Sequence, residues 1–142
     1  MLTNSAPLKT ELMKAKILVL DDEQTIRLLL EDFLTKRDYD VVVQKDGMSA
    51  LEWLEINIPD LIICDIQMPY LDGHEFLKKV RQRGYTKHTP VVMLSGSKEK
   101  SEDRVRCYRE GAQDFLAKPF NPEELVELIK KNLSPIHYAI KW

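Results

Sequence analysis

Short apolar runs alternate with longer amphipathic stretches along most of this 142-residue chain. Five runs have the length of buried strands, and three of them are apolar on both alternating faces. Parallel strands that are covered by helices on each side show this pattern. We therefore expect strands at residues 16–20, 39–43, 60–64, 90–94 and 114–117.

Helical periodicity occupies the intervals between these runs. In four intervals, apolar side chains recur every three or four residues and form one stripe. The stripes are Ile26, Leu29, Leu30, Phe33 and Leu34; Leu51, Leu54 and Ile58; Phe76, Leu77 and Val80; and Leu125, Leu128, Ile129 and Leu133. Asn121 as N-cap and Pro122 in the first turn begin the last helix.

The segment 98–110 differs from the other helical segments because charged residues dominate it. It offers only Val105, Cys107 and Tyr108 as apolar surface, so we expect a helix that packs weakly. Five strand–helix units in sequence predict an open, twisted parallel sheet with right-handed crossovers and helices on both faces. Functional residues of such a fold gather beyond the carboxyl ends of the strands.

Composition narrows the class of protein only slightly. With 21 basic and 23 acidic residues the net charge is −2, which gives no overall electrostatic case for binding nucleic acid or an anionic membrane. No apolar run approaches the roughly 20 residues of a membrane-spanning helix. Cys64 and Cys107 form no CxxC pair, which favours a reduced, cytoplasmic setting. We expect a leader (1–14), one domain (15–133) and a tail (134–142), with no output domain in this chain.

Residues that can perform chemistry stand at the ends of four predicted strands. They are Asp21, Asp22 and Glu23 after the first, Asp65 after the third, Ser95 after the fourth and Lys118 after the fifth. Each alone has an ordinary explanation as a helix cap, a turn residue or a solvated charge. The predicted sheet brings all four ends to one rim, however. There they fit a magnesium-assisted phosphoryl transfer in which Asp65 is the nucleophile, Lys118 supplies positive charge and Ser95 donates a hydrogen bond.

At these residues the sequence resembles the receiver domains of two-component response regulators, over about residues 15–133. The resemblance rests on Asp21-Asp22, the D-x-x-M-P segment from Asp65 to Pro69 that continues to Asp72-Gly73, Ser95, Phe115 and Lys118-Pro119. It implies a flavodoxin-like, doubly wound (βα)5 fold whose five-stranded parallel sheet has the strand order 2-1-3-4-5. No glycine-rich P-loop is present, so a nucleotide held in the usual cradle is not expected as phosphoryl donor.

The resemblance also implies a signalling role for this site. Asp65 would accept a phosphoryl group from a sensor histidine kinase or a phosphotransfer protein. The chain would promote only its own phosphorylation and dephosphorylation, and would not be an enzyme in the usual sense. Asp22, Asp65 and the backbone carbonyl of Gln67 would bind Mg²⁺, with Asp21 acting through a water molecule.

A conformational switch is the second implication of the resemblance. Ser95 and Lys118 would contact the phosphoryl oxygens, and the Lys118-Pro119 peptide bond would be cis. Movement of Ser95 toward the phosphoryl group would vacate space for Phe115, which stands where many family members have tyrosine. The surface made by the helix at 98–110, the fifth strand and the last helix would then bind a downstream protein target or a second copy of the chain. We expect neither direct nucleic-acid binding nor membrane binding.

Two alternative functions are also compatible with parts of the sequence. Asp21, Glu23 and Thr25 come within one residue type of the D-x-D-x-T/V motif of haloacid-dehalogenase-like phosphohydrolases, although Glu23 replaces the acid/base aspartate and no acidic pair follows Lys118. The other alternative is a non-phosphorylated pseudo-receiver that acts as a binding module. Against it, clustered carboxylates repel one another and are costly to retain without a metal.

Overall fold

The computed structural model describes residues 14–96 and 100–133, in which five strands alternate with five helices. The strands are β1 (Lys16–Leu20), β2 (Asp40–Gln44), β3 (Leu61–Asp65), β4 (Val91–Ser95) and β5 (Asp114–Ala117). The helices are α2 (Gln24–Thr35), α3 (Gly47–Trp53), α4 (Gly73–Gln82), α5 (Lys100–Arg109) and α6 (Pro122–Asn132). Apart from residue 14, the expected leader and tail lie outside the described residues.

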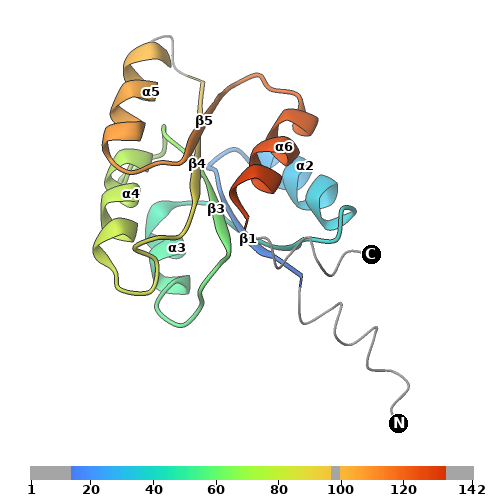
Figure 1. The fold of residues 1–142 in the computed structure, drawn as a ribbon, viewed down its shortest axis with the longest axis horizontal. Helices are drawn as coiled ribbons and strands as arrows, with labels where there is room; N and C mark the ends of the chain where they lie inside the picture. The colour runs from blue at the N-terminus through green and yellow to red at the C-terminus, as the bar shows by residue number, and fades with distance from the viewer. Residues whose placement is uncertain (1–13, 97–99, 134–142) are drawn as a thin grey trace.

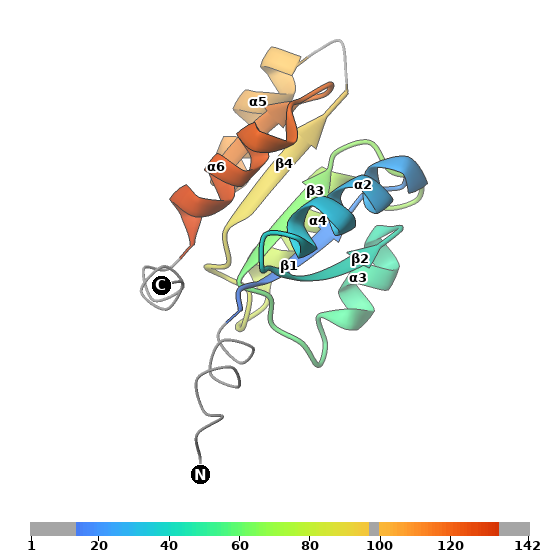
Figure 2. The ribbon, with the colours of Figure 1, turned by 90° about the vertical axis from the view of Figure 1, so that its right-hand side faces the viewer.

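All five strands are parallel and form one sheet in the order β2-β1-β3-β4-β5, which confirms the predicted flavodoxin-like topology. Figure 1 shows α3, α4 and α5 on one face of this sheet and α2 and α6 on the other. The turned view in Figure 2 shows α2 and α6 in front of the strands. The chain order reverses between the adjacent strands β1 and β3, which is where ligands bind in open α/β sheets.

Alternation along the strands divides the buried side chains between two cores. Leu18 of β1 and Met93 of β4 belong to the core beneath α3, α4 and α5. Their neighbours Val19 and Leu94 belong to the core beneath α2 and α6. All four side chains are fully buried. The strands are therefore apolar at successive positions because both of their faces are covered.

Three strands begin and end one residue later than the sequence predicts. As a result, Asp65 is the last residue of β3 and Ser95 is the last residue of β4. Ile66 N still donates a hydrogen bond of 2.9 Å to Leu94 O, so backbone pairing continues past the apolar run. The polar site residues are therefore held by the sheet itself.

Two apolar positions that the periodicity assigns to helical stripes are exposed instead. Ile58 lies beyond the end of α3 and is 56% exposed, because the chain leaves the helical path after Leu54. Leu29 lies on α2 but is 46% exposed, whereas Leu34 on the same helix is fully buried. The assignment of Ile58 to the helix at α3 is wrong, and Leu29 lies on its helix but outside the buried part of the predicted stripe.

The helix α5 has little apolar attachment to the rest of the fold, as predicted from its charge. Cys107 is fully buried, but Val105 and Tyr108 are 51% and 40% exposed. Within the described residues, no helix combines the length and apolar character that crossing a bilayer requires.

Arg81, in the last turn of α4, fastens the carboxyl end of α5. Its guanidinium donates hydrogen bonds of 3.1 and 2.8 Å to the carbonyl oxygen of Gly111, the second residue after α5, whose φ is 102°. Further bonds reach Thr86 O at 3.1 Å and Gln113 Oε1 at 2.8 Å. The same amide oxygen of Gln113 accepts from Val91 N at 2.7 Å. The end of α5, the end of α4 and the start of β4 therefore share one polar cluster.

Candidate functional site

The carboxyl ends of the strands carry the residues that the sequence singles out. Asp21 and Asp22 follow β1, Asp65 ends β3, Ser95 ends β4 and Lys118 follows β5. The first two aspartates and Asp65 each place one carboxylate oxygen within 4.8 Å of the other two. Two of these three carboxyl groups are buried, since Asp21 is 0% and Asp65 is 3% exposed. The predicted rim of carboxylates is therefore present in the fold.

Lys118 is the cation of this cluster. Its Nζ lies 2.9 Å from Asp21 Oδ2, 2.9 Å from Glu23 Oε1 and 3.5 Å from Asp65 Oδ1. Burial by itself would lower the pKa of Lys118, but its hydrogen bonds to Asp21 and Glu23 and the charge of Asp65 raise that pKa further than burial lowers it. Lys118 is therefore a permanent positive charge beside the buried carboxyl groups.

Asp65 has the most perturbed carboxyl group of the cluster. Burial, and then the negative charge of Asp21, raise the pKa of Asp65 from 3.8 to about 7, although Lys118 opposes this rise. A carboxyl group in such a site gains most from a further positive charge, because that charge favours its ionised form. The environment of Asp65 is therefore suited to a cation that binds between carboxylates.

Gly73 at the start of α4 fixes the backbone behind Asp65. Its N–H donates a hydrogen bond of 2.7 Å to Ile66 O. A Cβ atom on Gly73 would lie 2.4 Å from Asp65 O and 2.6 Å from Ile66 Cα, far inside van der Waals contact. The preceding Asp72 caps α4 in a reciprocal capping box with Glu75. Only glycine allows this helix to begin so close to the end of β3.

Ser95 and Lys118 are joined through their backbones. Lys118 N donates a hydrogen bond of 2.7 Å to Ser95 O, and the peptide bond between Lys118 and Pro119 is cis. Lys100 Nζ donates to Lys118 O at 3.0 Å. The Oγ of Ser95 donates to Asp103 Oδ2 on α5 at 3.1 Å. Ser95 is therefore hydrogen-bonded both to Lys118 and to α5.

The sequence indicated most of the residues that meet at this rim but not all of their contacts. The structure brings Asp21, Asp22, Asp65 and Lys118 together, and places Gln67 in the exposed loop after β3. The sequence indicated Glu23 at the end of the first strand but not its ion pair with Lys118, and Asp103 and Lys100 were missed altogether. Glu23 adjoins the acidic pair, so its position was a usable signal. The other two stand in a segment where charged residues are so frequent that none is distinguished.

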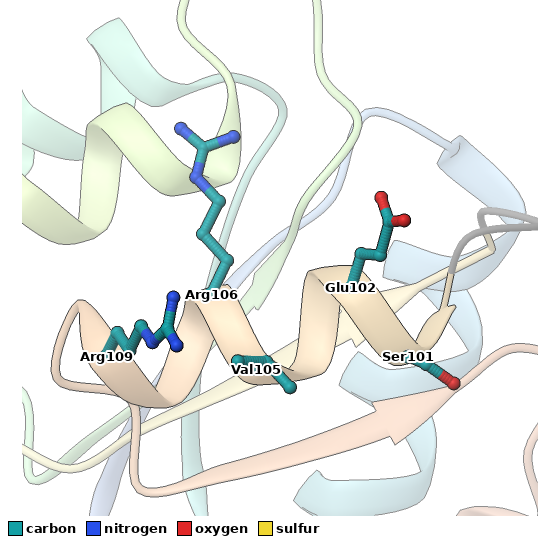
Figure 3. Close-up of a pocket in the computed structure, with 5 residues that line it drawn as sticks. All are labelled: Ser101, Glu102, Val105, Arg106 and Arg109. Carbon is teal, nitrogen blue, oxygen red and sulfur yellow. The ribbon is translucent and has the colours of Figure 1, made fainter.

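A separate pocket lies on the outer face of α5, away from the strand-end residues. It is lined by Ser101, Glu102, Val105, Arg106 and Arg109. Figure 3 shows Val105 between Ser101 and Arg109 along the helix, with the side chains of Glu102 and Arg106 extending from the same element. None of these residues belongs to the carboxylate cluster, so the two sites are distinct.

The chemistry of the donor set fits a hard divalent cation. Mg²⁺ prefers carboxylate and carbonyl oxygens and retains several water molecules, so two or three carboxylates suffice to bind it. Asp21, Asp22 and Asp65 supply such oxygens, and the exposure of Asp22 leaves the group accessible to solvent. The residues present therefore match Mg²⁺ in ligand type, with three carboxylate oxygens gathered within 4.8 Å of one another.

Comparison with known proteins gives a consistent match. The family described as response regulator receiver domain matches residues 17–130. The alkaline phosphatase synthesis transcriptional regulatory protein PhoP of Bacillus subtilis is 41% identical over 118 residues, which cover 83% of this chain and 48% of PhoP. The chain spans about half the length of the curated relatives it matches.

Solved structures resemble this chain over most of their length. The chemotaxis protein CheY4 of Vibrio cholerae has a TM-score of 0.79 at 35% identity, with 84% of this chain and 99% of that protein covered. The receiver domain of a sensor histidine kinase from Pseudomonas aeruginosa has a TM-score of 0.76 at 28% identity, with 84% and 97% covered. That structure is described with a magnesium ion coordinated in its active site cleft.

Proposed function

The chain belongs to the family of response regulator receiver domains, and from that premise we propose that Asp65 is its phosphoacceptor. The observation that carries this proposal is the position of Asp65: a buried carboxyl group that ends a central strand, flanked by two more aspartates and by Lys118 at 3.5 Å. The family match favours neither a haloacid-dehalogenase-like phosphohydrolase nor a pseudo-receiver.

The proposed reaction is the transfer of a phosphoryl group to a carboxylate. A carboxylate oxygen of Asp65 attacks the phosphorus of a phosphohistidine on a sensor histidine kinase or a phosphotransfer protein. The new P–O bond forms as the P–N bond breaks, and the leaving imidazole nitrogen keeps the electron pair of that bond. Negative charge spreads over the phosphoryl oxygens during the transfer. Lys118 is placed to stabilise this charge, since its ammonium already pairs with Asp65.

We assign the Mg²⁺ ligands to Asp22, Asp65 and the backbone carbonyl of Gln67, with Asp21 acting through water. When bound, Mg²⁺ neutralises charge on the carboxylates and on the phosphoryl oxygens. The burial and ion pair of Asp21 fix its carboxylate against Lys118, while Asp22 is exposed and faces solvent. We propose no turnover for this chain beyond its own phosphorylation and dephosphorylation.

We propose that the domain signals through the surface formed by α5, β5 and α6, which a partner binds. Ser95 and Phe115 lie on this side of the molecule, and both are buried. A downstream protein or a second copy of the chain would bind this surface differently in the two phosphorylation states. PhoP is named as a transcriptional regulator and is about twice as long as the matched segment. That this chain itself binds no nucleic acid stays a prediction.

Incubation with acetyl phosphate and Mg²⁺ tests the proposed function. We expect one phosphoryl group per chain, stable in acid and labile in base as an acyl phosphate is, and located on Asp65 by mass spectrometry after reduction with borohydride. Chelation of Mg²⁺ by EDTA before the donor is added should prevent incorporation. Phosphate on a serine or histidine, or repeated hydrolysis of phosphate esters without a labelled intermediate on Asp65, would disprove the proposal.

Magnesium should stabilise the protein through its carboxylate ligands. A ligand that binds only the folded state at ten times its dissociation constant adds about 1.4 kcal/mol, which raises the melting temperature by a few degrees. We expect this rise in the wild type and a much smaller one in Asp22→Ala, measured by thermal unfolding in millimolar MgCl₂. Asp32→Ala, which removes an exposed carboxylate from α2, is the matched control. An equal rise in Asp22→Ala would remove Asp22 from the ligand set.

A further inference from the structure

The hydroxyl of Ser95 donates a hydrogen bond to α5 in this structure. Its Oγ donates to Asp103 Oδ2 over 3.1 Å, and Ser95 is fully buried. Alternation along β4 places Ser95 on the same side of the sheet as Met93, which packs beneath α3, α4 and α5. A serine hydroxyl carries one proton. The proton that is shared with Asp103 is therefore not available to a phosphoryl oxygen on Asp65 at the same time.

A buried histidine lies beside Asp103. His74, the second residue of α4, has only 4% of its side chain exposed and places Nε2 3.7 Å from Asp103 Oδ1. The other ring nitrogen, Nδ1, lies 2.6 Å from Glu110 Oε1. Glu110 also pairs with Arg106 at 3.3 Å and with Lys78 at 3.6 Å. Asp103, which accepts the hydrogen bond from Ser95, is therefore one member of a polar cluster between α4 and α5. The side chain of Asp103 is 20% exposed.

The inner and outer faces of α5 are attached very differently. On the inner face, Asp103, Cys107 and the following Glu110 make the contacts described above. On the outer face, Val105 is half exposed in the open pocket of Figure 3. Because apolar packing is so limited, the hydrogen bonds from Ser95 to Asp103 and from Lys100 to Lys118 O are a substantial part of what holds the amino-terminal half of α5 to the sheet.

We propose that Asp103 is a positioning residue of the phosphorylation switch, an inference that rests on the proposed function of Asp65. In the unphosphorylated protein, Asp103 holds the Ser95 hydroxyl on the α5 side of β4. Phosphorylation sets the phosphoryl oxygens in competition with Asp103 for the single hydroxyl proton. When the phosphoryl oxygens bind that proton, α5 loses its polar contact with β4, and the surface that contains Val105 is rearranged. Asp103 thus opposes activation, and its removal favours the active state.

Binding of beryllofluoride in the presence of Mg²⁺, measured by calorimetry on the full chain, tests this inference. Beryllofluoride mimics a phosphoryl group on Asp65, so its affinity reports how readily Ser95 turns toward that group. Asp103→Ala should bind it roughly three- to tenfold more tightly than the wild type, the equivalent of one hydrogen bond. In a Ser95→Ala background, Asp103→Ala should change the affinity by less than about twofold, because the hydroxyl for which Asp103 competes is absent.

Glu102→Ala is the matched control, because it removes the neighbouring, exposed carboxylate of the same helix. We expect wild-type affinity from it. Asp103→Asn keeps the size of the side chain and an uncharged acceptor, and should give a smaller gain than Asp103→Ala. It serves as the test variant if the alanine variant does not fold. An equal effect of Asp103→Ala with and without Ser95, or no effect in either background, overturns the inference. A wild type that binds no beryllofluoride and accepts no phosphoryl group overturns the proposed function itself.

Discussion

Asp65→Asn is expected to abolish phosphoryl incorporation and, in the same protein, to raise the free energy of unfolding above pH 7. Loss of incorporation follows because an amide is not a nucleophile for phosphorus under these conditions. The gain in stability follows because ionised Asp65 is buried next to the negative charge of Asp21, and burial with that charge raises the pKa of Asp65 to about 7. Asparagine imitates the uncharged form and removes this repulsion.

The direction of the pH dependence follows from the two protonation states. In the metal-free wild type, folded Asp65 binds its proton more tightly than the unfolded chain does, so stability falls as the pH rises from about 4 through 7. Asp65→Asn does not lose stability in this way. Its free energy of unfolding should therefore exceed that of the wild type by a few kcal/mol at pH 8. Below pH 4 the two free energies should converge. Urea unfolding in EDTA between pH 3 and pH 8.5 measures the free energy of unfolding of the two proteins over this whole range.

Asp38→Asn is the control for this experiment. It makes the same chemical change at an exposed residue of the turn before β2, at the opposite end of the strands from the cluster. Its φ of 67° is one that asparagine also adopts readily, so we expect a change within about 0.5 kcal/mol at all pH values. Equal stability of Asp65→Asn and the wild type at pH 8 would contradict the burial of an ionised carboxylate at this position.

Gly73→Ala is expected to destabilise the fold by about 3 kcal/mol or more. Its added Cβ would lie 2.4 Å from Asp65 O, and neither that carbonyl nor the start of α4 can move without breaking the hydrogen bond from Gly73 N to Ile66 O. Overpacking against backbone is among the costlier kinds of core substitution. The strain falls on the residue that we propose as phosphoacceptor, so Mg²⁺ binding should weaken as well.

Gly84→Ala separates this local effect from any general effect of replacing glycine. A Cβ on Gly84 would meet no heavy atom within 4 Å. We expect a change within about 0.5 kcal/mol in urea unfolding and unchanged Mg²⁺ affinity. If Gly73→Ala were as stable as Gly84→Ala, the close approach of α4 to β3 would be wrong.

The proximity of Asp21, Asp65 and Lys118 could be predicted from the amino-acid sequence, because functional residues gather at the carboxyl ends of parallel strands. These residues follow strands whose apolar pattern is unambiguous, and strand order then fixes their proximity. The contact between Ser95 and Asp103 cannot be predicted in this way. It depends on how α5 is rotated about its own axis, and a helix with few apolar residues carries little information about that rotation. The prediction for Ile58 is wrong for a related reason, since a short stripe does not reveal where its helix ends.

The hydrogen bonds from Arg81 to Gly111 O limit how α5 can move. A helix of ten residues is about 15 Å long. Because the guanidinium of Arg81 holds Gly111 O, just after α5, with two hydrogen bonds, we expect α5 to tilt about the point near Gly111. A tilt of about 10° would move the first turn by roughly 2 to 3 Å and the last turn hardly at all. Amide exchange should then change on phosphorylation near Ser101 and stay constant near Arg109. A protein that binds the first turn of α5 would therefore encounter the full displacement, whereas one that binds near Gly111 would have the same affinity for both phosphorylation states.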